Sequence, residues 1–144
     1  MAQILTPQES RRRKGRGKYG ERQLVELLKE RGWNARRSAA SGIGRLFADV
    51  DAVWAGPGRE SLYVAFEVKT GHTKYIRVKG EQLLKLREAT SFFKGTCIGT
   101  QEVVAVRFTK ERVNTPWIFY QLKPEDFEKS GLTFRPTDTS DWEP

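Results

Sequence analysis

A carboxylate and a lysine interrupt one of the most apolar stretches of this 144-residue chain. Glu67 and Lys69 follow the apolar residues that begin at Leu62, and this stretch predicts a β-strand. Because residues two positions apart on a strand point to the same face, the two charged side chains are expected to project together. Burying them without partners would cost roughly several kcal/mol. Glu67 and Lys69 are therefore either a structural ion pair at a sheet edge or part of a charged functional site.

A second carboxylate is expected toward the same end of a hairpin. Asp51 begins the apolar segment before the Gly-Pro-Gly turn at 56–58, and the strand carrying Glu67 follows this turn. Two converging carboxylates either share a proton or bind a cation. With one histidine and one cysteine in the chain, Mg²⁺ is the favoured cation, Mn²⁺ is a substitute, and no small-molecule cofactor is expected. Beside such an ion, Lys69 would orient or deprotonate an attacking water.

The charge of the chain predicts a polyanionic partner. Its 26 lysines and arginines outnumber 18 aspartates and glutamates, which gives a formal net charge of +8. Nucleic acid and an anionic membrane surface both fit this charge. The longest apolar runs are far too short to cross a bilayer and no signal peptide is predicted, so an intracellular protein is expected, with DNA and no membrane as its partner. The expected location is the cytoplasm or nucleoid, in a host cell if the protein is viral. The residues expected to contact phosphates are Arg11, Arg12, Arg13, Lys14, Arg16, Lys18, Arg36, Arg37, Lys74, Arg77 and Lys79.

Hydrophobic periodicity predicts the elements that must position these residues. Helical spacing of leucines predicts a helix from Tyr19 to Gly32 and a second one from Leu83 to about Gly95. Apolar runs predict five strands, at 33–38, 50–55, 62–68, 103–108 and 117–122, and a single helical turn follows at 124–127. This order predicts one α/β domain, with a central mixed five-stranded sheet flanked by helices.

An aspartate, a turn and a Glu-x-Lys strand together resemble the PD-(D/E)XK nuclease superfamily. Further segments in the same order resemble the archaeal-type Holliday junction resolvases, from about Lys14 to about Leu122. The resemblance implies a restriction-endonuclease-like fold. The composition and the missing hydrophobic periodicity at the two ends predict a flexible basic arm at 1–17 and an irregular tail at 131–144 around a nuclease domain at 18–130. The segments that carry it are Lys14-Gly15, Gly20-Glu21-Arg22, the run from Arg37 to Gly42, Phe66 to Lys69, and Tyr75 to Val78 followed by Glu81-Gln82.

The resemblance implies a set of site residues and an activity. The family is homodimeric, uses Mg²⁺, and cuts four-way DNA junctions by paired nicks. The family's Pro-Asp is matched by Val50-Asp51, although Asp49 would share the same face and competes with Asp51. Counting from Ser41 favours Asp51, with Asp49 as an outer helper. The implied roles are metal binding for Asp51, Glu67, the Val68 carbonyl and the helix residue Glu21, catalysis for Lys69 and the loop residue Ser41, and DNA contact for Arg22 and Gln82.

Two other functions are open from the residues alone. Another PD-(D/E)XK enzyme, of restriction or repair type, would prefer linear duplex or single strands. A non-catalytic DNA-binding module would show no metal-dependent cleavage. The two acids and the lysine favour an enzyme, because a simple DNA binder gains nothing from carboxylates facing phosphates. RNA binding is the weakest alternative, since the usual sheet aromatics of RNA-binding motifs are missing.

Overall fold

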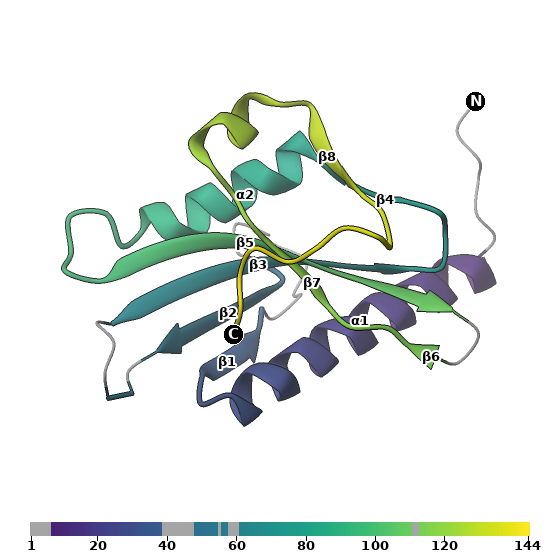
Figure 1. The fold of residues 1–144 in the computed structure, drawn as a ribbon, viewed down its shortest axis with the longest axis horizontal. Helices are drawn as coiled ribbons and strands as arrows, with labels where there is room; N and C mark the ends of the chain where they lie inside the picture. Colours follow the sequence, from purple (N-terminus) through teal and green to yellow (C-terminus); the bar gives the residue numbers. More distant parts are fainter. Residues whose placement is uncertain (1–6, 39–47, 55, 58–60, 111–112) are drawn as a thin grey trace.

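A mixed β-sheet forms the centre of the protein, and helices α1 and α2 pack on its opposite faces (Figure 1). The structure, a computed structural model, describes residues 7–38, 48–54, 56–57, 61–110 and 113–144, with side chains from residue 18 onward except at 113–114. The predicted single α/β domain with a five-stranded mixed sheet is confirmed. Its strands are β1 (Asn34–Arg37), β2 (Val50–Trp54), β3 (Leu62–Gly71), β5 (Gly99–Lys110) and β7 (Ile118–Gln121), and the two-residue β6 (Val113–Asn114) extends the pairing of β5.

The register of β2 and β3 decides which side chains meet. Strands β1, β2 and β3 are antiparallel neighbours, β3 pairs in parallel with β5, and β7 returns antiparallel to β5. Val50 lies opposite Phe66 at the end of the β2–β3 ladder. The parallel pair β3–β5 is covered on both faces, which explains its nearly continuous apolar sequence.

Two apolar layers follow from the alternation of side chains along β3. Val64 and Phe66 face α1 and pack with Leu24 and Leu28 of that helix. Tyr63 and Ala65 point the other way, into the layer that contains Leu83 and Leu86 of α2. Glu67 and Lys69 share the α2 side, because they continue the odd-numbered positions of the strand.

Helix α1 (Pro7–Glu30) begins 12 residues before the expected start at Tyr19. The backbone of residues 7–17 is therefore helical, whereas the sequence predicted an arm without regular structure. The segment is rich in arginine and lysine, which are good helix formers, and extending a helix costs far less than starting one. Helix α2 (Gly80–Ser91) covers most of the second predicted helix, and the 3-10 helix η1 (Pro124–Glu128) covers the predicted single turn.

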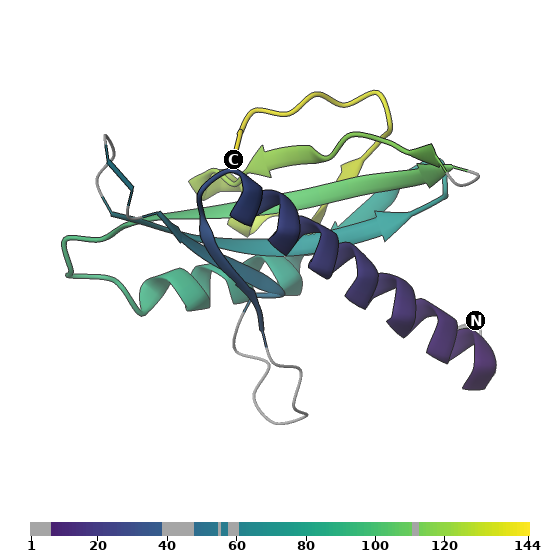
Figure 2. The same ribbon diagram turned by 90° about the horizontal axis from the view of Figure 1, so that it is seen from below.

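The C-terminal segment is more ordered than the irregular tail predicted for 131–144. Strand β8 (Gly131–Phe134) pairs antiparallel with β4 (Ile76–Lys79) in a separate two-stranded sheet. Further on, Trp142 is 8% exposed and joins the α1-side core. Figure 2 shows this last segment, in yellow, on the side of the central strands opposite to α2. The physical reason is the burial of two aromatic rings, Phe134 and Trp142, whose sequence spacing carries no periodic signal.

Replacing Trp142 with alanine should lower the free energy of unfolding by about 3–5 kcal/mol. The indole ring lies 5.4 Å from Phe66 and 5.3 Å from Phe119 between ring centroids, and its N–H donates to Gln101 Oε1 at 2.7 Å. Urea unfolding measures the change, followed by far-ultraviolet circular dichroism because this signal reports the backbone and not the removed tryptophan. Trp142→Phe is the control and should lose less, because it keeps an aromatic ring. An unchanged urea midpoint for Trp142→Ala would show that the segment adds nothing to stability.

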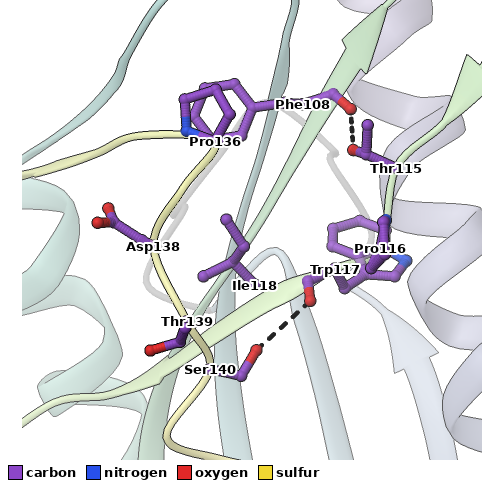
Figure 3. A pocket seen from close by; sticks show the side chains of 9 residues that line it. All are labelled: Phe108, Thr115, Pro116, Trp117, Ile118, Pro136, Asp138, Thr139 and Ser140. Atoms are coloured by element: carbon purple, nitrogen blue, oxygen red, sulfur yellow. Dashed lines mark hydrogen bonds between the residues drawn. The ribbon is translucent and has the colours of Figure 1, made fainter.

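A cavity of about 330 Å³ lies between β5, β7 and the C-terminal segment (Figure 3). Phe108, Trp117 and Ile118 line one side, and Pro136 and Ser140 line the other. The Ser140 hydroxyl donates to the Trp117 carbonyl at 3.4 Å and accepts from the Phe119 N–H at 2.9 Å, so the segment is tied to β7. The cavity contains none of the predicted site residues. In the described part of the chain, the helices are too short or too polar to cross a membrane.

Candidate active site

Asp49 and Glu67 are the two carboxylates that the fold brings together. Val50 is paired with Phe66, so the positions next along the two chains, Asp49 and Glu67, come side by side. Asp49 Oδ2 accepts a hydrogen bond from the Val68 N–H at 3.0 Å. The Asp49 side chain thus accepts a hydrogen bond from the β3 backbone just beyond the last residue pair of the β2–β3 ladder.

Glu67 is a buried acid in an unfavourable electrostatic position. It is 6% exposed, and burial together with the negative charge of Asp49 raises the pKa of Glu67 to about 8. Lys69 Nζ lies 3.7 Å from Glu67 Oε1 and lowers that pKa, as does the more distant charge of Lys85 on α2, but neither offsets the burial. The predicted pairing of Glu67 with Lys69 is present, within a cluster in which an extra positive charge would be strongly favoured.

Helix α1 supplies a third carboxylate near this pair. Glu21 Oε2 accepts a hydrogen bond from Arg37 Nε at 3.0 Å. Burial raises the pKa of Glu21, and the negative charge of Asp49 adds to that rise despite the opposing effect of Arg37. The helix can approach because residue 20 is glycine: a Cβ there would lie 2.6 Å from Thr70 Cγ2 on β3.

Asp51 occupies a different environment from the one expected for it. Its Oδ1 accepts from Arg36 Nε at 2.8 Å, and its Oδ2 accepts from Arg36 Nη2 at 3.2 Å and from the Tyr63 hydroxyl at 2.9 Å. Asp51 lies opposite Ala65, one same-face position away from Glu67. The carboxylate is thus engaged by two side chains, whereas Asp49 stands beside Glu67.

The remaining predicted site residues divide into three groups. Gln82 accepts from the Lys79 N–H at 3.0 Å and caps the start of α2, and Arg77 donates to the hydroxyls of Thr133 and Ser130. Ser41 lies outside the described residues, as do the side chains of Arg11, Arg12, Arg13, Lys14 and Arg16. The side chains of Lys18, Arg22, Lys74 and Lys79 are exposed.

A hard divalent cation fits the chemistry of this donor set. Within the described residues no group of three or more histidine, cysteine, aspartate or glutamate side chains is arranged as a metal cage. Mg²⁺ does not need one, because it keeps several water ligands and is usually bound by one or two carboxylates. Asp49 and Glu67 would provide those carboxylates, and burial together with the negative charge of Asp49 raises the pKa of Glu67, so a nearby cation would favour its ionised form.

The sequence pattern favoured Asp51 over Asp49 as the partner of Glu67, but the hairpin register places Asp49 beside Glu67 and Asp51 opposite Ala65. A shift of two residues leaves the side chain on the same face, so alternation cannot separate the two aspartates. Arg36 and Tyr63 were also missed as partners of Asp51. Both lie on the same face of the sheet as Asp51. Arg36 is directly opposite Asp51 on β1, and Tyr63 is diagonal to Asp51 on β3.

The fold and the acid–lysine cluster agree with the restriction-endonuclease-like class predicted from the sequence. The family model of the archaeal Holliday junction resolvases (Hjc) matches residues 11–135, and the chain belongs to this family. A solved structure of Archaeoglobus fulgidus Hjc, described as a Holliday junction resolvase from an archaeal hyperthermophile, is similar in fold, with a TM-score of 0.59. The two share 22% sequence identity over 83% of this chain and 84% of that one.

Proposed function

We propose that the protein is a Mg²⁺-dependent endonuclease that resolves four-way DNA junctions by paired nicks. The observation that carries this proposal is the buried Glu67 beside Asp49, with Lys69 Nζ 3.7 Å from the Glu67 carboxylate. Membership of the resolvase family supports the choice of substrate. A buried carboxylate pair of this kind costs stability in the metal-free protein, and acids with perturbed pKa values cluster at functional sites.

The residues that would hold Mg²⁺ are Asp49 and Glu67, together with the Val68 carbonyl. In a strand, the N–H and C=O of one residue point to the same neighbour, and the Val68 N–H points to Asp49. Glu21 would complete the site, directly or through a water. Bound Mg²⁺ supplies charge relief at the phosphate and a more acidic water. Lys69 orients the attacking water and stabilises the negative charge that develops on the phosphate.

The basic surface would hold the DNA, mainly through phosphates. The formal net charge of +8 and the exposed side chains of Lys18, Arg22 and Lys74 support this binding mode. Paired nicks require two active sites across one branch point, so the proposal includes a homodimer. An enzyme with this substrate acts where cellular DNA is, in the cytoplasm or at the nucleoid.

A cleavage assay with matched substrates tests the proposal. The purified protein is mixed with a four-way junction or with a linear duplex of the same length and arm sequence, in Mg²⁺, in Mn²⁺ and in EDTA. We expect nicks in two strands of the junction with either metal, little cutting of the duplex, and none in EDTA. Preferential cutting of the duplex would indicate a restriction or repair nuclease. Junction binding without cutting in any metal would indicate a non-catalytic DNA-binding module.

A further inference from the structure

Asp51 is buried without being part of the acid pair, and its hydrogen bonds hold an arginine at the surface. The residue is 8% exposed and lies between the buried apolar residues Val50 and Ala52. Arg36, by contrast, keeps 78% of its side chain exposed. An ion pair with so exposed a partner adds little to stability, whereas burying the carboxylate is costly. The arrangement is therefore poorly explained as a device for stability alone.

Asp51 holds Arg36 in one orientation. Two parallel hydrogen bonds, from Nε and Nη2, fix the plane of the guanidinium against the carboxylate. The Tyr63 hydroxyl donates to the same carboxylate, and the Tyr63 ring is held by Phe93, with 4.4 Å between ring centroids. The carboxylate is thus fixed from two sides before any ligand arrives.

The held guanidinium still has donors to offer. An arginine side chain carries five N–H donors, of which Asp51 takes two. Within the described part of the chain, the other three make no hydrogen bond to protein atoms. Fixed, exposed and planar N–H donors of this kind match the oxygens of a phosphate group.

Arg36 is also placed beside the acid pair. It lies opposite Asp51 in the β1–β2 ladder, on the face of the sheet that carries Asp49 and Glu67. Asp49 is two residues before Asp51 along the chain, and two residues span roughly 7 Å in an extended strand. A DNA strand bound at the acid pair would therefore lie within reach of the free edge of the guanidinium.

We infer that Arg36 binds a DNA backbone phosphate next to the one that is cut, and that Asp51 and Tyr63 are positioning residues that hold its guanidinium for this contact. The inference rests on the proposed function, since it assigns the contact to DNA lying in the same site. It gives the buried Asp51 a role that is separate from metal binding.

Junction binding without divalent metal, measured over a range of salt concentrations, tests the inference. Arg36→Gln should raise the Kd about tenfold and lower the salt slope by about one. Arg87→Gln is the charge-matched control, because the Arg87 guanidinium lies over the Phe127 ring, 5.0 Å from its centroid, on another surface. We expect a smaller loss of affinity for the control than for Arg36→Gln.

Asp51→Asn gives the sharpest result. The substitution makes the protein more positive by one charge, so electrostatics alone predicts tighter DNA binding. The positioning role predicts weaker binding, by several-fold, because the guanidinium loses its anchor. Tyr63→Phe keeps the ring on Phe93 and should weaken binding to a smaller extent. Thermal melting of each variant shows that it is folded at the assay temperature.

The two proposals fail in different ways. If Asp51→Asn binds as tightly as the wild type or tighter, and Arg36→Gln matches Arg87→Gln, the cluster is a structural ion pair only and the inference is overturned while wild-type nicking stands. If the wild type neither binds nor nicks branched DNA, the proposed function is overturned, and the inference with it.

Discussion

Replacing Asp49 with asparagine should lower the rate of junction nicking by about 10³-fold. The substitution keeps the shape of the side chain but removes the charge beside Glu67, and a metal that stabilises the transition state contributes several kcal/mol. The Val68 N–H can still donate to the asparagine side-chain oxygen, so the local backbone is expected to persist. Single-turnover nicking at saturating protein concentration, with Mg²⁺ present, measures the rate without interference from binding.

Asp51→Asn is the informative comparison for Asp49→Asn. Because Asp51 is engaged by Arg36 and Tyr63, its loss should act on junction affinity and change the saturated nicking rate by less than about tenfold. The opposite pattern, with a large loss of rate for Asp51→Asn and a small one for Asp49→Asn, would assign the metal to Asp51 and refute the arrangement proposed here.

Replacing Glu67 with glutamine should abolish nicking and at the same time stabilise the metal-free protein at alkaline pH. The loss of nicking is expected to reach about 10³-fold, for the same reason as at Asp49. Junction binding should persist, because Glu67 makes no favourable contact with a phosphate. Glu125→Gln, an exposed neutralisation on η1, is the control and should leave the nicking rate unchanged.

The gain in stability follows from the raised pKa of Glu67. In the folded metal-free protein this carboxyl has a pKa of about 8, against an ordinary value of 4.5. Its proton therefore contributes stability that is fully present below pH about 4.5 and is lost as the pH rises through about 8. Glutamine is neutral at every pH and avoids this loss. Urea unfolding in EDTA should show Glu67→Gln more stable than wild type at pH 9 and similar at pH 5, whereas equal stability at pH 9 would contradict the burial of a charged Glu67.

The sequence predicted the strands that carry the site better than it predicted the ends of the chain. The apolar runs around Glu67 and in β5 have the composition typical of strands that are covered on both faces of a sheet. Strand β8 and Trp142 carry no such signal, because they add single aromatic rings to cores built by other segments. The helical backbone at 7–17 was missed because the segment has no apolar periodicity and contains Gly15 and Gly17, although its arginines and lysines favour a helix.

The sequence predicted that an aspartate, a glutamate and a lysine form the site. Which aspartate lies beside the glutamate depends on the register of strands β2 and β3. Glu67 and Lys69 were identified because charges interrupt an apolar strand. The choice between Asp49 and Asp51 needed the pairing of Val50 with Phe66, which is set by the whole length of the hairpin and not by any local motif. Family membership likewise gives the nuclease class without fixing which of two neighbouring aspartates meets the glutamate.

The packing of Trp142 on Phe66 links the lifetime of the enzyme to a surface loop. Phe66 is the residue before Glu67, so the tryptophan supports the strand from behind at the point where the acid emerges on the other face. Residues 135–141, which connect β8 to Trp142, are all exposed. One proteolytic cut in this loop would release the tryptophan and loosen the acid pair while leaving the basic DNA-binding surface in place. Damage by a protease would then produce a protein that occupies junctions without resolving them.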